Sequence, residues 1–516
     1  MFSDARTRQT ASGRTVPVGV ALFALLAALL GAWSVPRSGL AREAEVRGAL
    51  RSAGYYNTEL GATVLDARLS TDLEFGPFTL GGVWRGYHLS DESYNPRGIE
   101  YPQPKIKHRY AEIALDRVPT GGSLTVRAGH FFSTFGRGLV LRSFEEVDLE
   151  TDTALDGILG EYERGAVRVS ALSGKTRVRV SNTSRREYTV EGAEVALAKQ
   201  GLVAFSASAL ARKQDLREDE PLRRVRRKEI ADKVVGGEAE AWLGPVHVAG
   251  DYVYREGDDY MAADKAKIYG HGGYLTGTVS TPMITALGEY KDYVRLDNPL
   301  VNPPTCLREH SSALMNRVTH EVNLRDERGF FAEGTLTVVE GTPLTMSASE
   351  ARLRSGDLAH WETYGRVEHE LGRLGLTTLE AAWSREYENI SGLGKFDEHV
   401  TAMLETGLVG EAGAVAEIGL GGQRTETPRE TYENWLASLT WYARQAVTVS
   451  AVAEATSEPG LARDFWIFGE VGVAVAQGLD VSLGLGTERG GKKCAGGVCY
   501  TEPEFTGVRV RLAKTF

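Results

Sequence analysis

The chain has 516 residues, 42% of them hydrophobic and 25% charged, with a formal net charge of −10 at pH 7. This acidic balance argues against nucleic acid as a partner, because nucleic-acid-binding surfaces are basic. Three cysteines in so long a chain exclude a scaffold held together by many disulfides. The mean hydropathy is slightly negative, so any lipid-facing surface must be hidden from a hydropathy plot by alternation with polar residues.

The first residues have the layout of an export signal. Several arginines precede an uncharged apolar run over residues 16–33, and Gly39 and Ala41 offer a cleavage site. We therefore expect a cleavable signal peptide over residues 1–41. The run is short for a bilayer-spanning helix, which needs about 20 apolar residues, and an uncleaved anchor is the alternative. No other stretch is apolar enough for a transmembrane helix.

Beyond this signal, runs of about ten residues alternate between apolar and polar side chains, as membrane-spanning β-strands do. The pattern is clearest over residues 246–255, 431–441 and 465–475. In the first of these, Tyr252 and Tyr254 have one parity while Asp251 and Arg255 have the other. One face of such a strand suits lipid and the other suits water. A helical period of 3.6 does not persist over any long segment.

The connections between these runs alternate in length. Tight turns are predicted at 76–77, 119–122, 244–245, 340–341, 372–375 and 410–413. Longer polar stretches separate them at 90–107, 213–232, 256–264, 297–312, 386–395 and 489–504. Short turns at one rim and long loops at the other are typical of outer-membrane barrels.

The fold class that follows is all-β, a transmembrane antiparallel up-and-down β-barrel of about 22–24 strands. Residues 42–516 read as a single domain, since no linker or change of composition interrupts the pattern. Two regions leave the strand count open. Residues 315–328 form either a strand or part of a long loop, and residues 45–58 form either the first strand or a lead-in.

The segment 129–157, GHFFSTFGRGLVLRSFEEVDLETDTALDG, is unlike an ordinary hairpin. It contains G-x-F-aromatic, then F-G-x-G-L, R-x-aromatic-E-E and A-L-x-G. With the C-x4-C pair and the P-E-F-T-G run near the carboxyl terminus, it resembles a family of outer-membrane β-barrel proteins of unknown function. The resemblance implies the barrel fold, and it implies no established activity, substrate or site residues.

The charges of this segment support two hypotheses, both placing Arg137, Arg142, Glu145, Glu146 and Asp148 in the lumen. In the structural one, the arginines pair with these acids and brace the barrel, because buried charges are normally paired. In the functional one, the segment folds inward as a constriction whose opposed charges select solutes.

Cys494 and Cys499 lie in a Gly-rich stretch before the last strand, and an exported setting permits them to form a disulfide. No companion ligands cluster near them, so a metal site is the weaker interpretation. Cys306 is then left over, either free or paired between molecules.

Signals for catalysis are poor. The ten histidines are scattered without H-E-x-x-H or another ligand spacing, and neither G-x-S-x-G nor a phosphate-binding loop is present. The acids at 256–264 lack the spacing of a known calcium loop. We therefore expect no enzyme activity, no cofactor and no metal.

The last strand alternates from Phe505 onward, with Val508, Val510 and Phe516 on one face. A terminal aromatic strand resembles the signal by which outer-membrane barrels are recognised for insertion. Lys514 departs from this pattern, but at a membrane rim its amine can reach water. We therefore expect the outer membrane of a Gram-negative-type envelope, with its lipid and the barrel-assembly machinery as partners.

The expected function is a porin-like or weakly selective pore for small solutes of unknown identity. Barrels well beyond eight strands leave a lumen wide enough for water unless something plugs it. Arg127, Asp251, Arg255 and Glu470 are predicted to line it. The alternative is a non-transporting envelope barrel that binds a partner through outer loops, especially 213–232 and 297–312. A hydrolase at the rim is a third hypothesis, without a visible nucleophile.

Overall fold

The computed structural model describes most of the chain after the amino-terminal segment. The described residues are 44–59, 61–90, 105–147, 151–179, 185–199, 202–215, 229–258, 267–310, 312–316, 320–388, 395–410, 415–443, 446–495, 498–502 and 504–516. The signal peptide predicted over residues 1–41 lies outside them.

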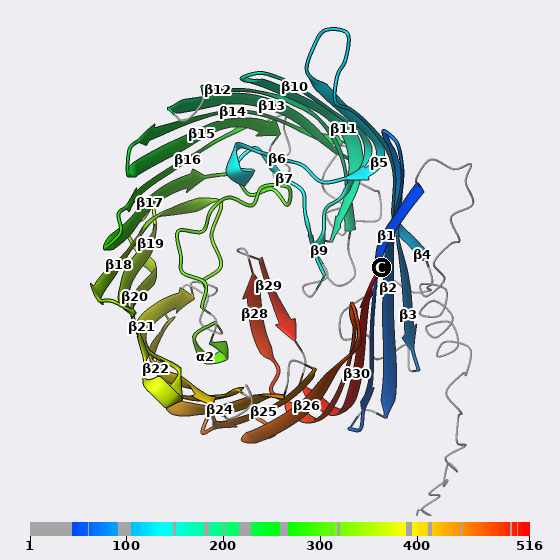
Figure 1. Ribbon diagram of the computed structural model, residues 1–516. Helices are drawn as coiled ribbons and strands as arrows, with labels where there is room; N and C mark the ends of the chain where they lie inside the picture. Colours follow the sequence, from blue (N-terminus) through cyan, green and yellow to red (C-terminus); the bar gives the residue numbers. More distant parts are fainter. Residues whose placement is uncertain are drawn as a thin grey trace, which may run out of the picture.

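Within the described residues, 24 antiparallel strands form one closed ring (Figure 1). Each strand pairs with the next along the ring, and the last pairs with the first. The strands are β1 (Ala44–Asn57), β2 (Ala62–Phe75), β3 (Phe78–Leu89), β4 (Lys105–Leu115), β5 (Ser123–Phe131), β10 (Leu155–Arg164), β11 (Val167–Arg179), β12 (Arg185–Lys199), β13 (Val203–Asp215), β14 (Glu229–Leu243), β15 (Val246–Asp258), β16 (Lys267–Ser280), β17 (Ile284–Val294), β18 (Asp326–Val339), β19 (Thr342–Leu353), β20 (Leu358–Glu370), β21 (Leu376–Glu388), β22 (Lys395–Val409), β23 (Val415–Glu426), β24 (Thr431–Ala443), β25 (Val447–Thr456), β26 (Phe465–Ala476), β27 (Leu479–Glu488) and β30 (Phe505–Thr515). The predicted all-β up-and-down barrel is confirmed.

The ring closes where β30 lies between β27 and β1. The register of β1 and β30 runs from Ala49 opposite Thr515 to Asn57 opposite Gly507. Gly507 has φ 152°, and a Cβ there would lie 1.8 Å from the backbone oxygen of Tyr56. Only glycine lets the two strands approach this closely, so the glycine before the alternating residues of β30 serves the closure.

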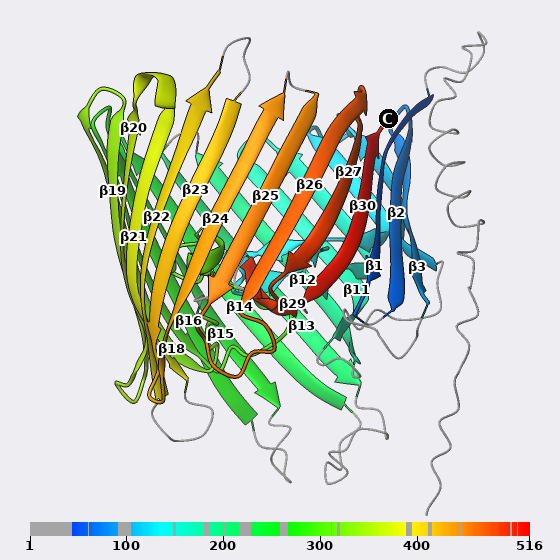
Figure 2. The ribbon, with the colours of Figure 1, turned by 90° about the horizontal axis from the view of Figure 1, so that it is seen from below.

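The two rims of the barrel differ as the turn pattern predicted. Each predicted tight turn falls in the sequence between strands that meet at one end, the short-turn rim, and each predicted long stretch falls between strands that meet at the other end, the long-loop rim (Figure 2). The carboxyl terminus lies at the short-turn rim, where Phe516 and Gly48 exchange two backbone hydrogen bonds. Residues 45–57 belong to the first strand, and residues 315–316 and 320–325 belong to a long connection that ends where β18 begins.

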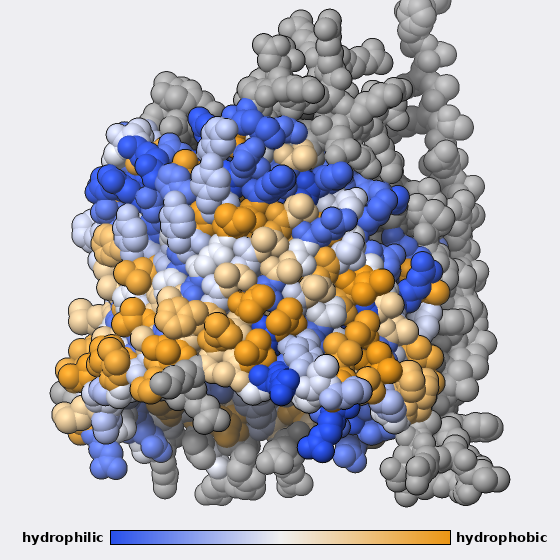
Figure 3. Space-filling view, turned by 90° about the horizontal axis from the view of Figure 1, so that it is seen from above, coloured by the Kyte–Doolittle hydropathy of each residue, from blue (hydrophilic) through white to orange (hydrophobic). Residues whose placement is uncertain are grey.

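The alternation also places side chains as predicted. Tyr252 and Tyr254 are exposed on the outer face, whereas Asp251 and Arg255 are buried on the inner face. On the face seen in Figure 3, apolar residues gather into a belt, with hydrophilic residues toward the edges. Such a belt matches the hydrocarbon layer that surrounds outer-membrane barrels.

Three of the long connections fold into the ring, and we name them insert 1 (132–154), insert 2 (295–325) and insert 3 (489–504). Their short elements lie inside the ring in Figure 1. These elements are β6 (Thr134–Phe135), η1 (Gly136–Gly138), β7 (Leu141–Arg142), β8 (Glu145–Glu146), β9 (Thr151–Asp152), α2 (Ala313–Asn316), β28 (Gly491–Ala495) and β29 (Val498–Glu502), while η2 (Gly372–Leu374) belongs to a turn at the short-turn rim. Among the helices in the described part of the chain, none has the length and apolar character to cross a membrane.

The main apolar core lies inside the barrel, between inserts 1 and 2 and the wall from β5 to β18. Insert 1 contributes Phe135, Leu139, Val140 and Leu141, and insert 2 contributes Leu296, Leu300, Val301 and Cys306. Burying one large apolar side chain contributes about 1.5–3 kcal/mol. Apolar packing therefore holds both inserts against this side of the wall.

Candidate functional site

Insert 1 packs on the wall at positions that are occupied by glycine. Glycines on three alternate strands, β12, β14 and β16, face the insert, and each lies against one of its apolar side chains: Gly192 against Phe135, Gly236 against Val140 and Gly272 against Leu139. At Gly236, a Cβ would lie 2.6 Å from Cγ2 of Val140. Side chains at these wall positions would collide with the insert, so the glycines act as its receptor.

Arg137 lies at the tip of insert 1 and pairs with wall carboxylates of β14 and β15. Its Nε lies 2.9 Å from Glu238 and 3.1 Å from Asp251, and its Nη2 contacts Glu240. The backbone of Arg137 has φ 46°, a left-handed conformation that a non-glycine residue adopts at a cost. The three carboxylates supply the interaction that offsets this strain.

The other predicted charges of this segment have partners outside it as well. Arg142 donates from its backbone to Leu300 O at 2.8 Å and from its side chain to Asn302 O at 3.4 Å, which joins insert 1 to insert 2. Its guanidinium also lies over the ring of Phe144, 5.2 Å from the centroid. The structural hypothesis paired Arg137 and Arg142 with acids of their own segment; the contacts described for them are with the wall and with insert 2.

Glu145 connects insert 1 to a second stretch of the wall, at β2 and β4. Its carboxylate pairs with Arg68 of β2 and with Lys107 of β4, the latter at 2.6 Å. Glu146 lies beside it in β8, opposite Thr151 of β9. Asp148, the remaining predicted constriction residue, lies outside the described residues.

The short hairpin of β8 and β9 holds a second acidic contact. Asp152 accepts from His108 Nε2 at 2.9 Å and lies 3.4 Å from Lys107. Burial raises the pKa of both Glu145 and Asp152, but the hydrogen bonds from Arg68 to Glu145 and from His108 to Asp152, together with the charge of Lys107, outweigh it, so both pKa values lie below the ordinary range. The hairpin is therefore docked on β2 and β4 by ionised carboxylates.

Insert 2 is tied to the wall by buried charges. Asp232 of β14 pairs with Arg212 and Arg255 at 3.3 and 3.2 Å, and it also accepts from Asn298 of insert 2 at 3.4 Å. Arg255 donates further to the backbone oxygen of Arg295 at 2.6 Å. A cation on each side of one carboxylate compensates much of the cost of burying it.

A histidine-rich cluster lies farther along insert 2. His320 contacts Glu327 of β18 through Nε2 at 3.0 Å and Glu386 of β21 through Nδ1 at 2.8 Å. Glu386 also accepts from His360 Nδ1 of β20 at 3.0 Å. Burial lowers the pKa of His320, but the two carboxylates outweigh it and raise that pKa to about 9. No sequence motif announced this cluster, because His320 and Glu386 are 66 residues apart.

The predicted lining residues lie on the inner face of the ring. Arg127 pairs with Glu112 at 2.6 Å, and Glu470 pairs with Arg511 at 2.8 Å. Asp251 and Arg255 are buried beneath inserts 1 and 2, in the contacts already described. At these four positions the inner wall is thus polar and ion-paired, and two of the positions are covered by the inserts.

A hollow of about 350 Å³ remains near the short-turn rim. Its lining includes Thr448, Gly472, Ser482 and Arg511, which lie directly opposite one another on β25, β26, β27 and β30. The first three are small, and the Arg511 side chain is 48% exposed. A row of small residues thus leaves the Arg511 side chain reaching into open space inside the barrel, where Asp480 of β27 also belongs to the lining.

Cys494 and Cys499 are directly opposite each other in the hairpin of β28 and β29. The pair therefore lies in a strand hairpin folded into the ring, where the sequence indicated a Gly-rich loop. Opposed residues of antiparallel strands have Cα atoms about 4.5–5.5 Å apart, within the range that a disulfide spans. Cys306 is a buried free thiol in insert 2.

A closed ring with an apolar outer belt, a charged interior and unequal rims defines an outer-membrane-type β-barrel. Residues 68–344 match a family of unknown function, DUF6029, and the chain belongs to that family. The family resemblance expected from the segment 129–157 is confirmed. A comparison with curated proteins found no match.

The chain is also similar to several solved barrels. They include the translocation pore of the P pilus usher PapC, at 10% identity and TM-score 0.48 over 91% of this chain and 99% of that one. The siderophore receptor PirA from Pseudomonas aeruginosa has 8% identity and TM-score 0.47 over 92% and 80% of the two chains. A BenF-like porin from Pseudomonas fluorescens Pf-5 has 11% identity and TM-score 0.39 over 75% and 100%. Similarity at this level assigns no activity to this chain.

The Gly236 contact allows the docking of insert 1 to be tested. We expect Gly236→Val to push against Val140, with an overpacking cost of about 1–3 kcal/mol. Such a cost raises the undocked fraction of insert 1 about 5- to 150-fold. Limited proteolysis of the folded barrel measures this as faster cleavage within residues 132–154.

Gly237→Val is the matched control, because the neighbouring residue has the opposite parity and a Cβ there would meet nothing nearer than Ser206 O at 3.5 Å. Equal cleavage rates in the two variants would contradict the docking of insert 1 on Gly236.

Proposed function

We propose that this protein is an outer-membrane pore that passes small solutes through a lumen narrowed by its own inserts. The observation that carries the proposal is the half-exposed Arg511 beside Glu470 in the hollow near the short-turn rim. An ion pair in an open hollow has a low free-energy cost only where water solvates it. Water on this side of the lumen is what a conducting path requires.

The inserts determine where the conducting path is narrow. Insert 1 packs on β12 to β16 through apolar contacts and on β2 and β4 through ion pairs. It therefore spans the part of the lumen that lies between these two stretches of the wall. Arg137, Arg142, Glu145 and Glu146 belong to this segment, and we assign them to the narrowing of the lumen.

A non-transporting barrel is the second candidate, and the apolar core inside the ring favours it. A lumen packed on one side by hydrophobic side chains can serve as a stable platform. Of the loops proposed to bind a partner, however, residues 297–312 fold inward and pack against the wall. Residues 216–228 of the other loop lie outside the described residues. The inward contacts of the described residues of 297–312 argue against a docking role for this loop on the outside.

The same proposal includes the export route. The chain would carry a cleavable signal peptide over residues 1–41, insert with the help of the barrel-assembly machinery and contact lipid through its apolar belt. The short-turn rim would face the periplasm and the long-loop rim the outside. The proposal assigns the chain no catalytic step.

Conductance in planar lipid bilayers tests the pore. We expect the purified, folded protein to conduct, and Arg511→Gln to shift its ion selectivity toward cations, because the variant removes a positive charge from the hollow. The shift should be largest at about 0.1 M salt or below, where charges act over about 10 Å or more. The reversal potential in a salt gradient measures it.

Lys514→Gln is the matched control, since it removes the same charge from the same strand at a residue of opposite parity, where the amine donates to Gln477 O. A folded protein that does not conduct would contradict the pore. Identical reversal potentials for wild type and Arg511→Gln would contradict the assignment of the hollow to the conducting path.

We further propose that Cys494 and Cys499 form a disulfide that closes the hairpin of insert 3, since their opposed positions suit one. After denaturation without reduction, alkylation should label a single thiol, that of Cys306, and reduction should expose two more. Intact mass measures both states.

A Cys306→Ser variant should take up no label before reduction. Three labels in the unreduced wild-type protein would reject the disulfide.

A further inference from the structure

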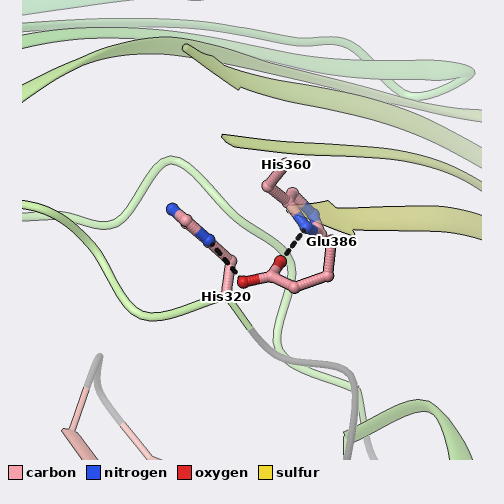
Figure 4. A group of neighbouring side chains, drawn as sticks. All are labelled: His320, His360 and Glu386. Carbon is pink, nitrogen blue, oxygen red and sulfur yellow. Dashed lines mark hydrogen bonds and ion pairs between the residues drawn. The ribbon is translucent and has the colours of Figure 1, made fainter. Parts of the chain in front are cut away.

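We infer that His320, His360 and Glu386 form a binding site for a divalent transition-metal ion, which fastens insert 2 to the barrel wall. His320 comes from insert 2, while His360 on β20 and Glu386 on β21 are directly opposite each other in the sheet. The three side chains converge from three segments (Figure 4). This inference does not rest on the proposed pore.

The spacing of the three side chains suits a metal. One ligand atom from each lies within 4.8 Å of the others. A zinc ion with bonds of about 2.0–2.2 Å holds tetrahedral ligands roughly 3.3 Å apart, so small side-chain rotations complete the site. Two imidazoles and one carboxylate suit zinc and its neighbours in the first transition row, and they suit calcium and magnesium poorly.

The surroundings orient His320 as a metal ligand. Its Nε2 lies 3.0 Å from Oε2 of Glu327, so the opposite nitrogen, Nδ1, faces Glu386. Metal-binding histidines usually donate their other ring N–H to a carboxylate in this way. Glu327 is itself held by Lys291 at 2.6 Å, with both side chains fully buried, and by the backbone N–H of Asn323 at 2.8 Å. Glu327, which orients His320, is therefore itself held in place.

A further histidine lies near these three residues. His399 of β22 is opposite Ser384, one inward-facing position along β21 from Glu386. Its Nδ1 lies 3.0 Å from Thr425 Oγ1. Either the remaining nitrogen of His399 or a water molecule can take the fourth position of a tetrahedral ion.

The other group of possible ligands in the described residues fits a metal less well. His108, Glu145 and Asp152 also lie close together. There, however, Lys107 and Arg68 already pair with the carboxylates. Glu386 instead contacts two imidazoles, which are themselves metal ligands through their ring nitrogens.

Zinc titration of the untagged, chelator-stripped barrel tests the inference. We expect isothermal titration calorimetry to find one zinc ion per chain, and Glu386→Gln and His360→Ala to weaken its binding at least 100-fold. Cobalt(II) should give the visible absorption of a tetrahedral site in wild type and in neither of these two variants. Each variant is first checked for the heat-dependent gel migration of a folded barrel.

His369→Ala is the matched control, because this histidine lies on the same strand as His360 with the opposite parity and contacts Thr342 near the short-turn rim. It should bind zinc as wild type does. Absence of zinc binding to wild type, wild-type affinity in Glu386→Gln, or an equal loss in His369→Ala would each overturn the site.

Discussion

The structure depends on the closing pairing of β1 with β30. In lipid every backbone N–H and C=O must find a partner within the protein, so a sheet can cross a bilayer only as a closed ring. Gly507 permits that closure, because any side chain there would meet the backbone of Tyr56. Once the ring is closed, strand alternation leaves one face for lipid and sends the polar residues inward.

A ring of this size then has an interior that must be filled by water, by chain or by both. The inserts fill part of it with a hydrophobic core, and charged contacts to the wall fix their positions. Arg137 reaches Glu238, Glu240 and Asp251 on one side, while Glu145 reaches Arg68 and Lys107 on the other. Near the short-turn rim the inner face of the wall is not covered by any described residue of an insert, at the hollow around Arg511. The interior is therefore asymmetric, packed on one side and open on another.

Much of this architecture was predictable because strand alternation and turn chemistry are local. Tyr252 against Asp251, or the glycine turn at 244–245, can be recognised within a few residues, and the strand count follows from repeating that pattern. The predicted signal peptide stays a prediction, since its residues lie outside the described chain.

The interior was not predictable in the same way. The long connection after β17 is recognisable as polar, but its inward path depends on contacts with strands distant in sequence. Arg137 was predicted among the lumen charges, but its partners Glu238 and Asp251 could not be identified without the register of β14 and β15. His320, His360 and Glu386 share no spacing, and only the fold brings them together.

The three inserts are proposed to narrow the lumen of a large barrel. The size cut-off of the conducting path tests this directly, and it is obtained from the effect of graded polyethylene glycols on single-channel conductance. We expect the wild-type protein to conduct and to exclude polymers that an empty 24-stranded ring would admit. Free access of those large polymers, or a folded protein with no conductance to measure, would contradict it.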